Sequence, residues 1–109
     1  MEKVYMVKPE ALREVKKSLE ADDELDGDEK KINQWKRRGY DLRDSESLGF
    51  QEEGSYLYVN APEEFFEENE EEIKHEGVKE LKADEKQKVI KAIEEEKENA
   101  AQGMGTIFD

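Results

Sequence analysis

The chain has 109 residues, of which 31 are acidic and 18 are basic, and its formal net charge is −13. This length predicts a single domain, and the absence of cysteine excludes disulfides, thiolate metal sites and thiol nucleophiles. No apolar run approaches the roughly 20 residues that cross a bilayer, and the N-terminus lacks the layout of a signal peptide. We therefore expect a cytoplasmic protein with no membrane partner. Its enrichment in Glu and Lys is also seen in proteins of hyperthermophiles.

A strand followed at once by a helix opens the chain. Residues 3–8, KVYMVK, are rich in β-branched and aromatic side chains, which is typical of a buried strand. Pro9 comes next and suits the first position of a helix, because its missing N–H is no loss there. Helical spacing then places four apolar residues on one face: Ala11, Leu12, Val15 and Leu19.

Residues 32–43 predict an edge strand. Charged residues stand between its aromatic ones, and such charges protect an exposed edge from aggregation. A bulge near Gly39 would bring three large side chains to one face: Trp35, Tyr40 and Leu42. A polar connection over 44–54 follows, in which Leu48 and Phe50 fold back on the sheet.

The segment 55–61, SYLYVNA, repeats the opening arrangement. It is the second strongly apolar strand, and it runs through Pro62 into a helix for which Gly77 is the predicted end. A short charged strand at 78–82 and a third helix ending at Gly103 complete the order. The predicted core-facing residues of these two helices are Phe65, Phe66, Asn69 and Ile73, then Val89, Ile90 and Ile93.

This order of elements predicts an α+β fold, the ferredoxin-like split βαβ sandwich. Its antiparallel sheet carries helices on one face, and here an extra C-terminal helix packs at an edge or on the open face. The first and third strands are central in that topology, and these are the two most apolar segments. We assign 1–103 to a single domain and 104–109 to an apolar tail. The tail either packs on its own sheet or contacts another chain, so a monomer and a homodimer are both compatible with the sequence.

The acidic stretch at 22–33, DDELDGDEKKIN, resembles the first half of a calcium loop. Such a loop needs oxygen ligands at positions 1, 3, 5 and 7 and a glycine at position 6, which would be Asp22, Glu24, Asp26, Asp28 and Gly27. Position 12, where a bidentate Glu closes the cage, is an asparagine. The sequence therefore predicts either a solvated turn or a weak calcium site, and it requires no other cofactor.

The helix after Pro62 carries a dense row of glutamates. Helical spacing places five of them together: Glu64, Glu67, Glu68, Glu71 and Glu72. Like charges three and four positions apart repel one another, so counterions or a basic partner would stabilise the row. It predicts either a solvated face or a docking surface for a basic protein.

The one basic cluster is WKRRGYDLR at 35–43. Arginines that alternate with aromatic residues on a sheet are what RNA-binding ferredoxin-like domains use, and the candidates are Trp35, Lys36, Arg37, Arg38, Tyr40 and Arg43. The net negative charge argues against nucleic acid as a partner. The alternative interpretation pairs these arginines with nearby carboxylates and places Trp35 in the core.

No catalytic constellation is evident. The serines lie in no nucleophile elbow, and the glycines form neither a phosphate loop nor a dinucleotide fingerprint. The sequence therefore favours a non-enzymatic, acidic interaction module that docks on a basic partner. The alternatives are a weak calcium-binding protein and an RNA-contacting domain.

Overall fold

The computed structural model describes residues 1–21 and 33–108, and the side chains of these residues as far as Asn99. Four strands form one antiparallel sheet in the order β2-β3-β1-β4. Their bounds are β1 Glu2–Val7, β2 Asp41–Asp44, β3 Ser55–Asn60 and β4 Val78–Leu81. The predicted ferredoxin-like topology is confirmed, because the two most apolar strands, β1 and β3, are adjacent and central.

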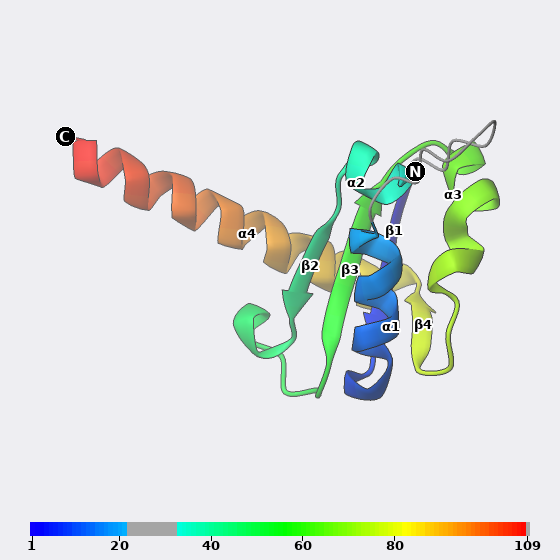
Figure 1. Ribbon diagram of the computed structural model, residues 1–109. Helices are drawn as coiled ribbons and strands as arrows, with labels where there is room; N and C mark the ends of the chain where they lie inside the picture. The colour runs from blue at the N-terminus through cyan, green and yellow to red at the C-terminus, as the bar shows by residue number, and fades with distance from the viewer. Residues whose placement is uncertain (22–32, 109) are drawn as a thin grey trace.

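One face of the sheet is covered by α1 (Pro9–Glu20) and α3 (Glu63–Asn69), as Figure 1 shows. Alternation along β1 turns Tyr5 and Val7 to this face, and both are buried. The larger of the two core clusters lies here, and it includes Phe65, Phe66 and Ile73. Asn69 is buried as well, so all four residues predicted to face the core from the second helix are buried.

The opposite face of the sheet carries α4 (Ala83–Phe108), which passes behind the sheet in Figure 1. Val89, Ile90 and Ile93 are all buried against Val4 and Tyr56 of the central strands. The extra helix therefore takes the open face of the sheet, one of its two predicted positions. Leu48 and Phe50 also pack on this cluster, as predicted.

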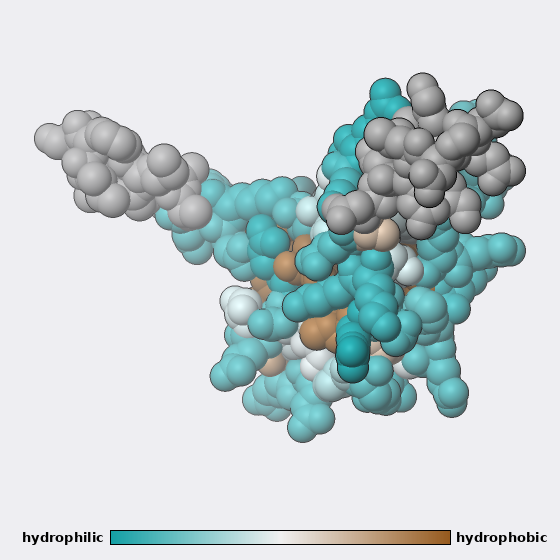
Figure 2. Space-filling model, viewed as in Figure 1, coloured by the Kyte–Doolittle hydropathy of each residue, from teal (hydrophilic) through white to brown (hydrophobic). Residues whose placement is uncertain are grey.

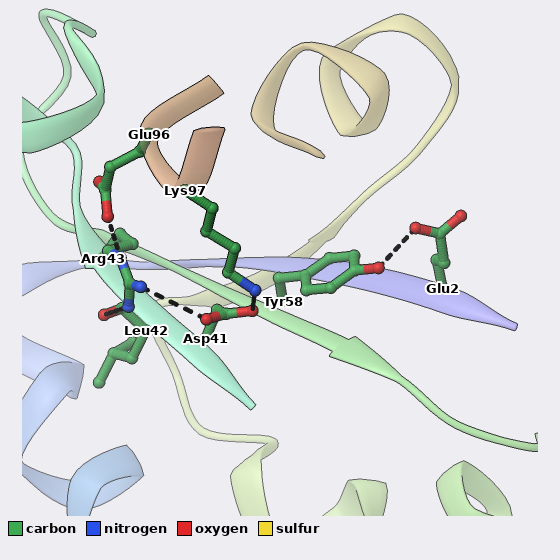
Figure 3. Close-up of polar contacts among 7 residues, drawn as sticks. All are labelled: Glu2, Asp41, Leu42, Arg43, Tyr58, Glu96 and Lys97. Carbon is green, nitrogen blue, oxygen red and sulfur yellow. Dashed lines mark hydrogen bonds and ion pairs between the residues drawn. The ribbon is translucent and has the colours of Figure 1, made fainter. Parts of the chain in front are cut away.

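Two ion pairs fasten α4 to the edge strand β2. Arg43 Nε donates to Glu96 Oε1 at 2.7 Å, and Lys97 Nζ donates to Asp41 Oδ2 at 2.8 Å (Figure 3). Asp41 also accepts from Arg43 at 3.4 Å, so these side chains form one network between helix and strand. This network lies one helical turn beyond Ile93, the last buried residue among the α4 side chains that the structure describes, which end at Asn99.

The predicted strand over 32–43 is wrong in its first half. Residues Gln34–Arg38 form a short helix, α2, and only Asp41–Asp44 pair as a strand. Asn33 is the physical reason, because its side-chain oxygen accepts from the backbone N–H groups of Trp35 at 3.0 Å and Lys36 at 3.2 Å. Such an N-cap stabilises the first turn of a helix. Trp35 nevertheless belongs to the main core cluster, and Tyr40 and Leu42 pack against the same cluster, so the three side chains share one face as the sequence predicts.

Two predicted helix ends are also wrong. The helix after Pro62 does not reach Gly77: its α-helical part ends at Asn69, and a 3₁₀ helix, η2 (Glu70–Ile73), follows it directly. Another 3₁₀ helix, η1 (Glu46–Leu48), lies in the connection between β2 and β3. The last helix does not end at Gly103, because α4 continues to Phe108 and extends well beyond the sheet (Figure 1). A glycine inside a helix costs only about 1 kcal/mol, which does not force an end. The predicted tail 104–109 is therefore helical as far as Phe108.

None of the helices in the described part of the chain is long and apolar enough to span a membrane.

Candidate functional site: the glutamate row and the adjacent cleft

The predicted glutamate row lies on α3 and η2. Helical spacing in α3 buries Phe65 and Phe66 and leaves Glu64, Glu67 and Glu68 exposed. Figure 2 shows that hydrophilic side chains cover most of this side of the molecule, with apolar surface only in the gaps between them. The buried phenylalanines hold the row in place, because they fix α3 on the sheet.

The change from α-helix to 3₁₀ helix separates the last two members of the row. Glu71 is exposed, whereas the carboxylate of Glu72 accepts a hydrogen bond from Trp35 Nε1 at 2.8 Å. Ser18 Oγ also donates to the backbone carbonyl of Glu72 at 2.8 Å. Glu72 therefore connects η2 to α1 through its backbone carbonyl and to α2 through its carboxylate.

Four glutamates of the row remain without such a partner: Glu64, Glu67, Glu68 and Glu71. Across the described part of the chain, none of these four makes a hydrogen bond or an ion pair with its side chain. They occupy only eight consecutive positions, so the local density of uncompensated negative charge is high. Such a surface attracts cations and basic protein surfaces over distances of about 8 Å at physiological salt.

Glu70 was absent from the sequence-based prediction and is the most highly connected carboxylate of this region. Its Oε2 accepts from Lys3 Nζ at 2.8 Å and from the Tyr5 hydroxyl at 2.6 Å. Lys74 Nζ lies 3.1 Å from Oε1. Three donors thus converge on one carboxylate at the edge of the core, and they fix the start of η2 against β1.

These contacts shift the proton affinities of the groups involved. Partial burial raises the pKa of Glu70, but hydrogen bonds from Lys3, Tyr5 and Lys74 outweigh it and hold the pKa at about 2. Burial and the hydrogen bond to Glu70 raise the pKa of the Tyr5 hydroxyl well above its ordinary value. Burial lowers the pKa of Lys3, and Glu70 more than compensates, so the net shift is upward. Glu70 is therefore a fixed anion and Tyr5 a fixed hydrogen-bond donor at neutral pH.

A cleft of about 400 Å³ opens beside this network, at the end of the sheet. Phe66 and Leu81 contribute apolar surface to it, and Lys3 lies over the Phe66 ring at 4.8 Å from the centroid. The cleft is bounded by α3 on one side and by the β4–α4 junction on the other. Ala83, at that junction, has a φ of +52°, the one positive φ of a non-glycine residue in the described chain. Such strain is concentrated at functional sites.

The predicted RNA-contacting residues are not brought together on one surface. Trp35 is fully buried, and its ring packs edge-on against Phe65 with 5.0 Å between centroids, so no base can stack on it. Arg43 faces α4, where it pairs with Glu96. For Trp35 and Arg43 the structure agrees with the alternative interpretation of the basic cluster: Trp35 lies in the core, and Arg43 pairs with a nearby carboxylate.

The other residues of the basic cluster lie on or beside α2. Arg37 and Arg38 are exposed, and Arg38 lies 5.8 Å from the centroid of the Phe65 ring. Lys36 is exposed, and Tyr40 is partly buried against the main core. Of the six predicted RNA-contacting residues, those that remain on the surface near α2 are Lys36, Arg37, Arg38 and part of the Tyr40 ring.

The predicted calcium ligands, Asp22, Glu24, Asp26 and Asp28, lie outside the described residues. Within the residues that are described, no group of three or more histidine and acidic side chains could hold a metal ion.

Comparison with known proteins gives no relative: no family model, no curated protein and no solved structure matches the chain.

The sequence could not have identified Glu70 by spacing, since its partners Lys3 and Tyr5 are 67 and 65 positions away. The available signal was the alternation of β1, which places Lys3 and Tyr5 on the same face of the sheet as α3.

Proposed function

We propose that this chain is a non-enzymatic interaction module that docks on a basic protein surface through Glu64, Glu67, Glu68 and Glu71. The observation that carries the proposal is that these four exposed carboxylates have no partner among the described residues. Glu72, the fifth member of the predicted row, contributes by holding η2 in position through Trp35.

Mutual repulsion within the row favours such a docking. Like charges three and four positions apart destabilise a helix by a few tenths of a kcal/mol per pair, and a cationic surface would relieve this repulsion in the complex. Charge complementarity of this kind mainly accelerates association and selects the partner. The row is also preorganised, because Phe65, Phe66 and Glu70 anchor α3 and η2, so little ordering is needed on binding.

The test compares two quadruple variants of equal net charge. The first carries Glu→Gln at 64, 67, 68 and 71, and the second carries Glu→Gln at four exposed positions elsewhere: Glu46, Glu53, Glu95 and Glu98. Both are immobilised and exposed to lysate of the source cells at low and high salt, and retained proteins are quantified by mass spectrometry. We expect basic proteins to be retained by the wild type and the second variant at low salt only, and to be lost from the first.

Equal retention by the two variants would show that only the net charge matters. Retention that does not change with salt would also contradict the proposal, because exposed charge pairs are screened by ions.

The calcium and RNA hypotheses stay predictions. The calcium ligands lie outside the described residues, and burial removes Trp35 from the surface that RNA would contact.

A further inference from the structure

We propose that a second cleft, between α2 and α3, binds the phosphate group of a small phosphate monoester. The residues of the described chain that line this cleft are Gln34, Arg37, Arg38 and Phe65. The proposal is independent of the glutamate row, because a different set of side chains would contact the ligand. It rests on the lining of the cleft, on its unpaired arginines and on the fixed position of α2.

All three polar residues of the lining carry N–H donors suited to an oxyanion. Gln34, Arg37 and Arg38 stand at positions i, i+3 and i+4 of α2, so they share one face of the helix. Each guanidinium presents its N–H groups in a planar fork that matches the oxygens of phosphate or carboxylate, and the Gln34 amide adds an NH₂ donor. No acidic residue of the described chain lines this cleft. The lining therefore selects an anion.

Arg37 and Arg38 lack carboxylate partners, although the chain has 31 acidic residues. Within the part of the chain that the structure describes, neither guanidinium group makes an ion pair or a hydrogen bond. Glu64 and Glu68 stand on either side of Phe65 in the sequence of α3, and neither pairs with these arginines, so their carboxylates lie more than 4 Å from both guanidinium groups. The donors of both arginines are therefore available to a ligand.

The position of α2 is fixed by two of its neighbouring contacts. Asn33 caps its first turn, and the fully buried Trp35 packs edge-on against Phe65 with 5.0 Å between ring centroids. Arg38 lies 5.8 Å from the centroid of the same Phe65 ring, where a guanidinium gains cation–π attraction. The backbone that carries the arginines is thus in place before a ligand binds, which reduces the ordering cost of binding.

The size of the cleft favours a small phosphate monoester. Its volume of about 250 Å³ lies slightly below the roughly 300–1,000 Å³ of typical small-molecule sites, so it fits a phosphate group with a short organic residue. Two guanidinium groups match the charge of about −1.5 to −2 that a phosphate monoester carries at pH 7. A carboxylate carries a single negative charge and leaves one of the two arginines uncompensated.

The net charge of −13 opposes the binding of any anion. At physiological salt the Debye length is about 8 Å, so distant carboxylates are largely screened and the groups close to the phosphate dominate. As neighbours of Phe65, Glu64 and Glu68 still weaken binding. We therefore expect a dissociation constant in the millimolar range.

The test is an NMR titration of the ¹⁵N-labelled full chain, at neutral pH and physiological salt, with glycerol 3-phosphate, glycerate and glycerol. We expect glycerol 3-phosphate to shift the amide signals of Gln34 and Arg38 and the Nε–H signals of Arg37 and Arg38. Glycerate should bind about tenfold more weakly, the equivalent of 1.4 kcal/mol, and glycerol should not bind.

Two variants assign the site to the arginines. Arg37→Gln and Arg38→Gln should each weaken the binding of glycerol 3-phosphate about tenfold, because each removes one fork of charge-assisted hydrogen bonds. Arg13→Gln is the matched control, since it makes the same substitution at an exposed residue of α1 outside the cleft, and it should bind as the wild type does. Circular dichroism checks that each variant is folded, and all three positions are exposed.

The quadruple Gln variant at 64, 67, 68 and 71 separates this site from the glutamate row. It should bind glycerol 3-phosphate more tightly than the variant with Gln at 46, 53, 95 and 98, because it removes the two carboxylates that flank Phe65 at the same net charge. The same variant should lose basic proteins, so the two proposals predict opposite changes. Failure of either proposal would leave the other unchanged.

Four results would overturn the phosphate site. They are no shift of the Arg37 and Arg38 signals at tens of millimolar glycerol 3-phosphate, equal affinities for glycerol 3-phosphate and glycerate, equal affinities of the Arg37→Gln and Arg13→Gln variants, or weaker binding by the quadruple row variant than by its matched variant.

Discussion

Glu70 joins residues that are far apart in the sequence. Its carboxylate binds the ammonium of Lys3, the hydroxyl of Tyr5 and the ammonium of Lys74. Its side chain is only 15% exposed, so these contacts are weakly screened by water. Helical spacing alone groups Glu70 with its exposed neighbours, and only the position of β1 beside η2 distinguishes it from them.

We expect Glu70→Gln to lower the free energy of unfolding at pH 7 by about 1.5–3 kcal/mol, the usual loss for hydrogen bonds to a charged group. The folded-state pKa of Glu70, about 2, lies below its ordinary value of 4.5. The stabilisation is therefore fully present above pH 4.5 and is lost as the pH falls through about 2. Urea unfolding of both proteins at several pH values should show the difference shrinking over this interval.

Glu71→Gln is the matched control, because Glu71 is an exposed neighbour with no side-chain partner among the described residues. It should change the stability by less than about 0.5 kcal/mol. A loss equal to that of Glu70→Gln would mean that net charge, rather than the Lys3–Tyr5–Glu70 contacts, determines the effect.

Asn33 connects two helices at the scale of elements. Its oxygen caps α2, and its Nδ2 donates to the carbonyl groups at the end of α1, with Ala21 O at 2.7 Å and Leu19 O at 3.0 Å. One side chain thus provides hydrogen-bond partners for backbone carbonyls at the end of α1 and for backbone N–H groups at the start of α2, which have no partner within their own helix. The charged, alternating sequence of 34–38 favours an edge strand, but this capping arrangement makes it a helix and turns Trp35 into the core.

Asn33→Ala should destabilise the fold by about 1–2 kcal/mol, the usual cost of losing an N-cap. Asn33→Asp keeps the acceptor for the α2 N–H groups and loses the donor to α1, so it should cost less than Asn33→Ala. Chemical unfolding followed by the fluorescence of Trp35, the only tryptophan, measures both. Equal losses for the two substitutions would assign the whole effect to the contacts with α1.

Among the described side chains of α4, as far as Asn99, three buried apolar residues attach the helix to the open face of the sheet: Val89, Ile90 and Ile93. Ile93 is 2% exposed and packs in the cluster that includes Val4 and Tyr56. Ile93→Ala should cost about 2–4 kcal/mol, because it removes buried methyl groups and leaves a cavity. Lys91→Ala, on the exposed side of the same helix, should have little effect on the urea midpoint.

If Ile93→Ala proved as mild as Lys91→Ala, the ion pairs of Arg43 and Lys97 shown in Figure 3 would have to hold α4 instead. Exposed pairs of this kind contribute only about 0–1 kcal/mol.

At the scale of the whole molecule, self-repulsion opposes folding. A net charge of −13 on 109 residues destabilises the compact state, and salt weakens this repulsion because the Debye length falls from about 30 Å at 0.01 M to about 8 Å at 0.15 M. We therefore expect the thermal midpoint to rise with sodium chloride over this range. The quadruple Gln variant at 64, 67, 68 and 71 should show a smaller rise in calorimetry.

A midpoint that falls with added salt would mean that attractive pairs, such as Lys3 with Glu70 and Arg43 with Glu96, contribute more to stability than the general repulsion does.

The sequence by itself determined the sheet and the residues that face its core. The two apolar strands at 3–8 and 55–61, each followed by a proline, lie side by side as β1 and β3. Both are short, nearly continuous apolar runs, a local pattern that is typical of strands buried on both faces of a sheet, and their two faces contribute to the two core clusters. The helical spacing of Phe65, Phe66 and Ile73 identified their buried face in the same way.

Only the tertiary structure decided where the charged residues act. The fold turned Glu72 towards Trp35, placed Glu70 between Lys3 and Tyr5, and brought Arg37 and Arg38 into one cleft with Phe65. A glutamate that binds a distant lysine and one that faces water have the same local sequence pattern, because their difference arises from partners many residues away. Which apolar residues are buried follows from their spacing in the sequence, which is a local property. Which partner a charged residue binds depends on the residues close to it in space, and these are brought together only when the chain folds.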